Sequence, residues 1–434
     1  MKKRNKEKVK SGKRKTVKKI ILIVLLVSVV FLATGIIYFE IEPENTNINY
    51  EPADAQKVTD TTIRFDSEGK LKILHIADTH LNYDRNFDAS IWVIAEACDV
   101  EKPDLVVLTG DNTHPDEDPA KTKKLINALM NIFESRNIPV AVTFGNHDSE
   151  AGPMTREDIM EYYNTFSCTI SVDDSINFKN CATFNIPVLA SDSDKVKFNL
   201  WVFDSGDYDE DDPRHYDRVR TEQIEWYKQT SAKLKEENGG ETVNSVVFQH
   251  IIVPEIYDVL EKVDSKQPFA VEHIYNEDEY YMFDPEGVNY GILNEKPCPG
   301  YYNDGQFDAL VETGDVLAMF TGHDHTNAFG VRNQNIDIYT SPMTRYKGLA
   351  YTTQYGYRVV EIDENDTSTY ETRVERLYDV FDFDYIKTAK ENGDKYSKRI
   401  AFELAVKGWV QEGFMNLYQS TVELFSGREV EYPD

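Results

Sequence analysis

The sequence predicts an α/β protein built on a largely parallel sheet. Apolar runs with β character occupy residues 71–78, 105–110 and 139–145. Between them, residues 90–99 and 120–135 have the apolar spacing of helices. This β-α-β-α-β order implies right-handed crossovers and parallel strands covered by helices. A hydrophobic fraction of 41% indicates a substantial folded core within the 434 residues.

Shorter strands are expected after residue 168, including one at 197–204. A helix at 221–235 then leads to strands at 243–250, 316–322, 336–341 and 357–362. Residues 254–307 are rich in Tyr, Asn, Glu and Pro and are expected to form a long insertion that caps the domain face. The sequence therefore predicts a folded domain over residues 70–378, followed by a helical C-terminal extension over 379–434.

The N-terminus has the pattern of a membrane anchor. Residues 1–19 contain eleven Lys or Arg and one acidic residue, and residues 20–39 carry no charge. At about 1.5 Å per residue, a helix of this length spans the roughly 30 Å hydrocarbon core of a bilayer. A cleaved signal peptide is the alternative, but its apolar region is shorter and ends in small residues. An uncleaved signal anchor is therefore expected, with residues 40–69 as a polar linker.

The charge distribution predicts which side of the membrane each part occupies. By the positive-inside rule, the basic segment 1–19 is expected in the cytoplasm and the folded domain outside, as in a single-pass protein of the cell membrane. After residue 19 the chain has 36 basic and 75 acidic residues, a formal charge of −39. A domain this acidic repels polyanions, so nucleic acid is not expected as its main partner. Small phosphorylated compounds remain compatible with it.

The four cysteines have no metal-binding spacing. Cys168 and Cys181 flank a predicted hairpin. In an oxidising compartment they could form a disulfide, and buried free thiols are the alternative.

Five predicted strands each end in residue types that bind metals. In α/β sheets, loops at the carboxyl ends of strands meet at one edge, so distant clusters can form one site. Taken singly, each cluster is typical of ordinary turn chemistry or, for a lone histidine, of a buried core residue. Together, at five strand ends, they indicate a dinuclear metal site. The clusters are Asp78-Thr79-His80, Gly110-Asp111-Asn112, Gly145-Asn146-His147-Asp148, Gln249-His250 and Gly322-His323-Asp324-His325.

This ordered series resembles the motifs of the calcineurin-like metallophosphoesterases, over about residues 71–362. The resemblance implies a four-layer αββα sandwich with two metal ions at the sheet ends. A carboxylate can bridge two cations through its two oxygens, and neutral imidazole suits Mn, Fe or Zn. The resemblance assigns one metal to Asp78, His80, Asp111 and His325, and the other to Asp111, Asn146, His250 and His323, with Asp111 as the bridge.

Further segments resemble the bacterial, fungal and plant relatives of purple acid phosphatases: 205–208, 223–227, 294–310 and 322–327. Two positions depart from the purple enzymes. His80 stands where they have glycine, and His114 stands where they have the tyrosine that follows the bridging aspartate. No purple iron–tyrosinate centre is therefore expected.

The resemblance implies hydrolysis of phosphate esters by a hydroxide held between the two metals. His147 would face the leaving oxygen and protonate it. Asp148 would orient His147 by a hydrogen bond, with a turn-capping carboxylate as the alternative. Weaker candidates near the site are His114, Glu295, Tyr301, Tyr302 and Asn303, whereas His75, His215 and His273 are expected to be structural.

Three functions are compatible with this sequence. The first is a phosphomonoesterase, and the second is a phosphodiesterase acting on nucleotides, lipid headgroups or wall polymers. The third is a surface binding protein whose catalytic site has decayed. Coordinating side chains stand at all seven predicted ligand positions, which argues against decay.

Overall fold

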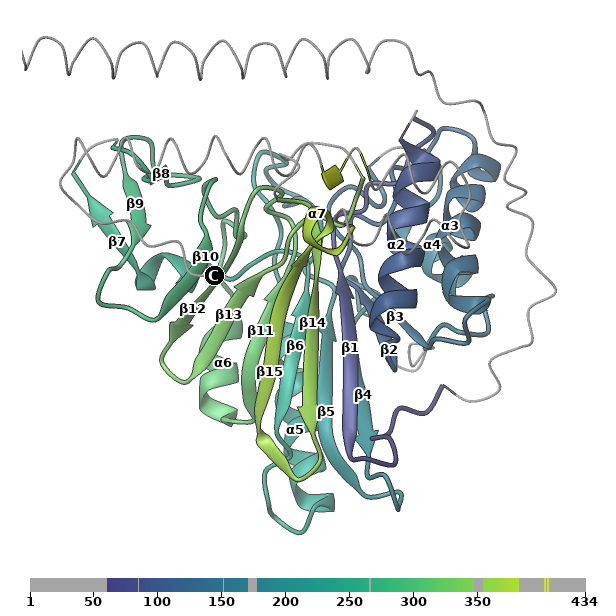
Figure 1. Ribbon diagram of the computed structural model, residues 1–434. Coiled ribbons are helices and arrows are strands. Elements are labelled where there is room, and N and C mark those ends of the chain that lie inside the picture. The colour runs from purple at the N-terminus through teal and green to yellow at the C-terminus, as the bar shows by residue number, and fades with distance from the viewer. Residues whose placement is uncertain are drawn as a thin grey trace, which may run out of the picture. The chain divides into compact units, whose positions relative to one another are not determined.

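The computed structural model describes residues 61–84, 86–150, 152–170, 178–264, 267–346 and 354–381, together with residues 402, 404 and 405. Two large sheets form the centre of the domain (Figure 1). The first has the strand order β15-β14-β1-β2-β3, and the second the order β10-β12-β13-β11-β6-β5-β4. The first comprises β1 (Lys70–Ile76), β2 (Leu105–Leu108), β3 (Val140–Val142), β14 (Gly356–Asp363) and β15 (Asp366–Arg376). The second comprises β4 (Phe184–Leu189), β5 (Val196–Phe203), β6 (Ser245–Gln249), β10 (Asn289–Ile292), β11 (Val316–Thr321), β12 (Ala328–Asn333) and β13 (Ile336–Thr340).

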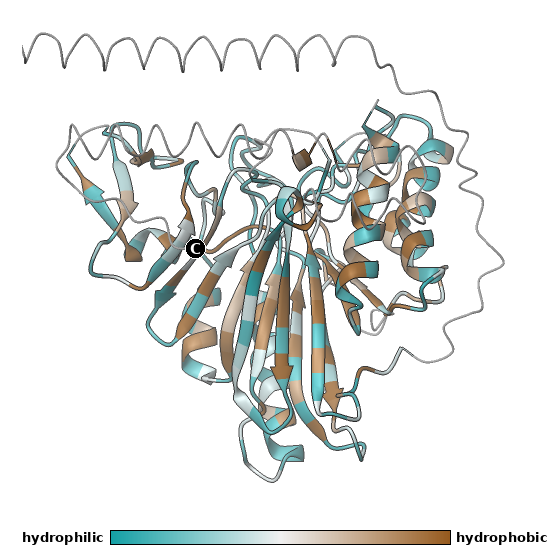
Figure 2. Ribbon diagram, in the orientation of Figure 1, coloured by the Kyte–Doolittle hydropathy of each residue, from teal (hydrophilic) through white to brown (hydrophobic). Residues whose placement is uncertain are grey.

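The helices lie on the outer faces of the two sheets, with one apolar cluster between the sheets and one under each helical layer. In β2, Leu105 and Val107 point into the cluster between the sheets, whereas Val106 and Leu108 point toward the helices. Both faces of the strand are buried, which explains its continuous apolar sequence. Figure 2 shows brown, apolar segments along the strands of the two sheets. The first sheet is covered by α2 (Phe87–Glu101), α3 (Pro119–Glu134) and α4 (Arg156–Tyr163), and the second by α5 (Thr221–Glu237) and α6 (Gln306–Thr313).

The two sheets are mixed, where the sequence predicted a largely parallel sheet. The strands β1, β2 and β3 are parallel, as are β5, β6, β11 and β13. Antiparallel strands extend both sheets at their edges. Among them, β14 and β15 form a hairpin in which Asp363 pairs with Asp366. The sequence predicted β14 as the strand 357–362 but not β15, because a hairpin needs no crossover helix and the β-α-β pattern does not report it.

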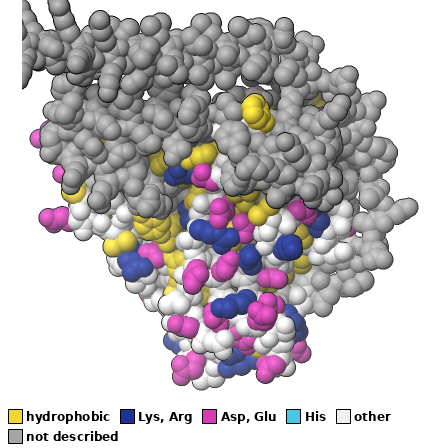
Figure 3. Space-filling model, in the orientation of Figure 1, with side chains coloured by type: hydrophobic (Ala, Val, Ile, Leu, Met, Phe, Trp, Pro, Cys, Tyr) yellow, Lys and Arg dark blue, Asp and Glu magenta, His cyan; other side chains and the backbone are white. Residues whose placement is uncertain are grey.

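Charged side chains protect the edge strand β15 from pairing with a strand of another chain. Arg373 forms ion pairs with Glu101, Glu361 and Glu375. Figure 3, in the orientation of Figure 1, shows acidic and basic side chains interspersed over the described part of the visible surface. Charged side chains on an edge strand discourage pairing with another chain.

The predicted insertion, residues 254–307, has its own structure and is tied to the second sheet. It contains the short helix η1 (Pro254–Val259), a small sheet of β7 (Leu260–Val263), β9 (Tyr280–Phe283) and β8 (Val271–Glu272), and the strand β10. Asn327 Oδ1 accepts hydrogen bonds from the backbone amides of Asn294 and Glu295, and Asn327 Nδ2 donates to the carbonyl of Glu295. These bonds attach the insertion to the loop that follows β11.

The folded region begins before the predicted domain start. Ile63 and Phe65 are buried, and the amide of Phe65 donates to the carbonyl of Leu189. The end of the predicted linker 40–69 is therefore part of the domain core, because its alternate side chains are apolar.

No helix among the described residues is long and apolar enough to cross a membrane. The predicted segments 1–19 and 20–39 lie outside the described residues, as does most of the extension 379–434. In that extension, Leu404 and Ala405 are buried. The short helix α7 (Leu377–Val380) directly follows β15. Cys168 and Cys181 are free thiols; Cys168 is buried, as the second alternative expected, and Cys181 is half-buried.

The core between the sheets yields a stability prediction. Phe248 on β6 is fully buried and stacks on Phe320 of β11, with 5.2 Å between ring centroids. Phe248→Ala should lower the free energy of unfolding by about 3 to 5 kcal/mol, because it leaves a cavity that the two sheets cannot close. Urea unfolding measures this, with the exposed Val288→Ala as control. A loss below about 1 kcal/mol would show that this position does not support the core.

Candidate metal centre

The predicted site residues meet at the carboxyl ends of four parallel strands and in the loop after β3. Asp78 and His80 follow β1, and Asp111 follows β2. Asn146 and His147 follow β3, His250 follows β6, and His323 and His325 follow β11. Parallel strands end at one edge of a sheet, so loops far apart in the sequence come together there.

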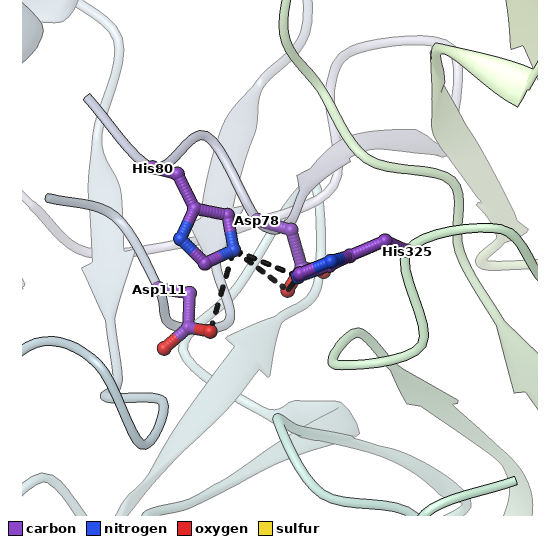
Figure 4. A group of neighbouring side chains, drawn as sticks. All are labelled: Asp78, His80, Asp111 and His325. Carbon is purple, nitrogen blue, oxygen red and sulfur yellow. Dashed lines mark hydrogen bonds and ion pairs between the residues drawn. The ribbon is translucent and has the colours of Figure 1, made fainter. Parts of the chain in front are cut away.

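Two groups of side chains have the arrangement of metal ligands. The first contains Asp78, His80, Asp111 and His325, whose side chains point toward one another in Figure 4. The second contains Asp111, His250 and His323. Within each group, one potential ligand atom from every residue lies within 4.8 Å of the others. Asp111 belongs to both groups, as a bridging carboxylate must.

Individual distances in the two groups converge on the Asp111 carboxylate. His80 Nε2 lies 3.5 Å from Asp111 Oδ2 and 2.8 Å from His325 Nε2. From the other side, His250 Nε2 lies 3.3 Å from the same Asp111 oxygen. Three imidazole nitrogens and a carboxylate oxygen thus surround one small volume.

Four buried polar atoms of the site have no hydrogen-bond partner. Asp111 Oδ2 and His250 Nε2 form an ion pair at 3.3 Å, whereas Asn146 Oδ1 and His323 Nε2 are unpaired. Burying an unpaired atom costs about 1 to 3 kcal/mol, which a bound cation would offset. Nitrogen and oxygen lone pairs of this kind suit transition-metal cations. The chemistry of the donor set therefore fits a pair of metal ions. The atoms are Asp111 Oδ2, Asn146 Oδ1, His250 Nε2 and His323 Nε2.

The backbone at the site is strained in a way that turns the ligands inward. Asp78, Asp111 and His323 have φ values of 55°, 49° and 73°, in the left-handed region. Each such residue costs on the order of 1 to 3 kcal/mol and persists where the surrounding structure imposes it. The loop after β3 approaches so closely that a Cβ on Gly145 would lie 2.2 Å from Asp111 Oδ1. Only glycine fits at that position.

Burial and mutual charge shift the pKa values of the site. Burial raises the pKa of Asp78 to about 7. Burial alone would lower the pKa of His250, but the Asp111 carboxylate outweighs burial and raises it to about 9. Burial alone would raise the pKa of Asp111, but the nearby His250 outweighs burial and holds it well below its usual range. Burial lowers the pKa of His325 to about 4.

The expected contact between Asp148 and His147 is replaced by others. Asp148 Oδ1 accepts hydrogen bonds from the amides of Asn112 and Thr113, and Oδ2 accepts from the amide of Gly145. Asp148 therefore joins the loop after β2 to the loop after β3, as a turn-capping carboxylate does. The carboxylate that contacts Nδ1 of His147 is Glu150.

His114 contacts a predicted ligand. Its Nε2 lies 2.9 Å from His80 Nδ1, and the two rings stack with centroids 4.7 Å apart. An imidazole that binds a metal through one nitrogen uses the other for an orienting hydrogen bond. His114 is thus placed to orient His80.

Four of the weaker candidates lie in the insertion 254–307. Glu295 accepts a hydrogen bond from the amide of Thr326, next to His325. Asn303 donates to Glu255 at 2.7 Å. Tyr301 is 46% exposed, as is its neighbour Tyr302, so these rings remain open to solvent.

The histidines expected to be structural have partners away from the two groups. His75 bonds with Thr109 and Ser341 inside the core. His215 stacks on Tyr301, with ring centroids 3.8 Å apart. His273 accepts a hydrogen bond from the amide of Tyr275.

Tyr208 is a site residue that the sequence did not single out. Its hydroxyl accepts a hydrogen bond from Asn146 Nδ2 at 3.0 Å. It belongs to the segment 205–208, which resembles relatives of purple acid phosphatases, but that resemblance assigned no role to Tyr208. The ring of Tyr216, which stacks on Tyr208, also packs edge-on against His323.

The fold and the two buried ligand groups are those of the two-metal phosphoesterase class. The calcineurin-like phosphoesterase family model matches residues 71–327. The chain belongs to this family.

Three relatives show distant similarity. The chain is 28% identical to "Probable inactive purple acid phosphatase 14" of Arabidopsis thaliana, over 69% of this chain and 77% of that protein. It is 27% identical to "Probable inactive purple acid phosphatase 29" of the same plant, over 64% of this chain and 72% of the relative. It is 26% identical to "Phosphatase DCR2" of Saccharomyces cerevisiae, over 66% of this chain and 49% of that protein.

The pKa shifts predict that metal loading releases protons. At pH 7, His250, with a pKa of about 9, is protonated and Asp78, with a pKa of about 7, is half protonated. Both must lose their protons to coordinate a cation, so about one to two protons should leave per protein. Affinity should accordingly rise with pH until His250 is neutral. Calorimetry of Mn²⁺ binding to chelator-treated protein, in buffers of different ionisation enthalpy, counts the protons. A count of zero at pH 7 would contradict these ionisation states.

Proposed function

We propose that the chain is a metal-dependent phosphoric-ester hydrolase, and specifically a phosphomonoesterase. One observation carries the proposal: two ligand groups share the Asp111 carboxylate, and three of their atoms, with Asn146 Oδ1 beside them, are buried without a hydrogen bond. Membership of the phosphoesterase family makes a phosphorylated compound the expected substrate. The metal pair is proposed to come from Mn, Fe and Zn, which suit a mixed imidazole and carboxylate site.

The seven predicted ligands keep their roles in this proposal. When bound, the two cations would act as Lewis acids that activate water and offset the charge of the phosphate oxygens. Asn146 contributes an oxygen without adding negative charge beside an anionic substrate. One cation would be held by Asp78, His80, Asp111 and His325, and the other by Asp111, Asn146, His250 and His323.

His147 is proposed to protonate the leaving oxygen. Its side chain is 28% exposed, and its ring centroid lies 5.4 Å from that of His80. It is therefore beside the ligand groups and open to a bound substrate. The backbone amide of His147 donates to Asp111 Oδ1 at 2.8 Å, which fixes the residue relative to the site. Asp148 is proposed to act on the same chemistry indirectly, by holding the two loops together.

Two other functions remain as alternatives. The first is a phosphodiesterase, because the same site chemistry can cleave a phosphodiester. The second arises because two plant relatives carry "inactive" in their names. A binding protein with a decayed site is the corresponding alternative for this chain. The complete set of coordinating side chains in the chain favours activity.

The location is also a proposal. The uncharged run 20–39, preceded by eleven basic residues, supports a cytoplasmic N-terminus and a domain outside the cell membrane. Protease digestion of intact cells tests this, because an outward domain is cleaved without lysis. Protection of the domain in intact cells, with cleavage after lysis, would place it inside.

Metal content and substrate preference test the function together. The purified full chain should contain about two transition-metal ions and hydrolyse an aryl phosphate monoester faster than the matching diester. Asp111→Ala should lose both ions and all activity, because it removes the shared carboxylate. Asp194→Ala, at a side chain that is 91% exposed, is the control. Two bound ions without hydrolysis of either ester would support the decayed-site alternative, and faster diester cleavage would support the phosphodiesterase.

His147→Ala should separate metal binding from catalysis. The variant should keep both ions, since His147 is outside the two ligand groups. Its turnover of an alkyl phosphate should fall by about 100- to 10,000-fold, the range for loss of a general acid. Elemental analysis and steady-state kinetics measure the two effects. Full turnover in the metal-replete variant would remove His147 from the mechanism.

A further inference from the structure

A chain of polar side chains joins the proposed ligand Asn146 to the imidazole of His147. Asn146 Nδ2 donates to the Tyr208 hydroxyl at 3.0 Å, and that hydroxyl donates to Glu150 Oε1 at 3.3 Å. The other carboxylate oxygen of Glu150 contacts His147 Nδ1. The Tyr208 phenol therefore contacts a proposed ligand, the Glu150 carboxylate contacts the proposed general acid, and a hydrogen bond joins the two.

Tyr208 determines which end of the Asn146 amide faces the site. The oxygen and nitrogen of an amide are similar in size, so hydrogen-bond partners decide its orientation. The hydroxyl proton of Tyr208 is directed to Glu150, so its oxygen is free to accept from Nδ2 of Asn146. Asn146 Oδ1 is left buried and without a hydrogen-bond partner. This is the orientation that a cation needs.

Glu150 determines the tautomer and direction of His147. A carboxylate beside Nδ1 keeps a proton on that nitrogen, so the proton given to the leaving oxygen comes from Nε2 and the neutral Nδ1–H tautomer remains after transfer. This is the task that the sequence assigned to Asp148, whose oxygens instead accept backbone amides. The side chain of Glu150 is 46% exposed, so it is reached by solvent, whereas Asp148 is buried.

The position of Tyr208 is fixed independently of Asn146. Its ring stacks on Tyr216, with centroids 5.6 Å apart, and Tyr216 in turn packs edge-on against His323. The preceding turn requires glycine, because Gly206 has φ 78° and a Cβ there would lie 2.3 Å from Asp217. The hydroxyl is thus presented to Asn146 by a preformed loop.

We propose that Tyr208 and Glu150 are positioning residues of the metal centre. Tyr208 turns the Asn146 oxygen toward the second cation, and Glu150 orients His147 toward the leaving oxygen. The Glu150 role rests on the proposed hydrolase function, and the Tyr208 role rests only on metal binding.

Tyr208→Phe tests the first role without any assay of activity. The variant keeps the ring and loses only the hydroxyl, so the second Mn²⁺ should bind about 10- to 100-fold more weakly, the usual cost of removing an orienting partner. The first Mn²⁺ should bind as before. Tyr162→Phe is the matched control, because its hydroxyl also bonds an asparagine, Asn127, at 2.7 Å and lies outside the site. Equal binding of the second Mn²⁺ to Tyr208→Phe and wild type would overturn this role.

Glu150→Gln tests the second role through leaving groups and through His147. The variant should slow hydrolysis of alkyl phosphates by about 10- to 100-fold and of activated aryl phosphates far less, because a good leaving group needs no proton. When combined with His147→Ala it should add little further loss, since both changes act through the same proton donor, His147. Glu161→Gln, on the exposed side of α4, is the control. Additive losses, or equal slowing of both esters, would overturn the role of Glu150.

Nitrogen NMR of the His147 imidazole gives a readout that does not depend on turnover. In the neutral imidazole of the wild type Nδ1 should carry the proton, and in Glu150→Gln the neutral ring should shift toward the Nε2–H tautomer. An unchanged tautomer would overturn the Glu150 role. An inactive wild type that binds two Mn²⁺ would instead overturn the hydrolase proposal and the catalytic purpose of Glu150. The metal-binding and NMR results would still decide whether Tyr208 orients Asn146 and whether Glu150 orients His147.

Discussion

The site depends on a carboxylate that is buried among imidazoles. Asp111 is inaccessible to solvent, yet its charge is favoured because His250 lies 3.3 Å away on one side and His80 3.5 Å away on the other. Removing a charge from water is costly unless opposite charge or coordination compensates for it. A fold that buries this group must therefore bring compensating groups from several loops to one point. The two sheets accomplish this by ending four parallel strands at one edge.

The rigid packing of the sheets supports the strain of the loops. The strands next to the site are buried on both faces, so they cannot relax when a following residue is held in the left-handed region. Close approach of the loops adds a second constraint. A Cβ on Gly322 would lie 2.6 Å from Asp78 Oδ2, so this loop can reach the carboxylate only through glycine. Stability in the sheets is thus coupled to geometry at the metal centre.

The sequence predicted the parts of the fold whose signal is local. Central strands such as β2 were predictable because they are continuously apolar, and α3 because its apolar positions repeat at helical spacing. The edge strand β15 was missed because its exposed side chains are polar. The short helix α4 was also missed, although Thr155 and Asp158 form a capping box that could have indicated its start. The early start of the domain at Ile63 depends on pairing with Leu189, a contact that no local pattern reports.

The same distinction applies to the site. Ligand types at strand ends were visible because each cluster is contiguous, and the structure brings them together. The neighbours of Asn146 and His147 were not visible, because they depend on which loops meet in space. Tyr208 and Glu150 are 58 residues apart, and only the packing of β5 beside the first sheet's loops joins them. Assigning Asp148 to His147 relied on adjacency in the sequence, whereas backbone amides compete for a buried carboxylate and here take both of its oxygens.

Charge balance explains why neutral ligands predominate in this centre. The chain beyond residue 19 carries a formal charge of −39, so a phosphorylated substrate approaches against a repulsive field. Of the seven proposed ligands only Asp78 and Asp111 are acids, and two divalent cations would outweigh them and leave a local excess of positive charge. Buried charges are screened less than the surface acids, so this excess would govern the last few ångströms of approach. An aspartate in place of Asn146 would give the same geometry with less attraction for the substrate. In the proposed centre the amide, and the hydroxyl of Tyr208 that bonds to it, would therefore serve affinity for an anion as well as coordination.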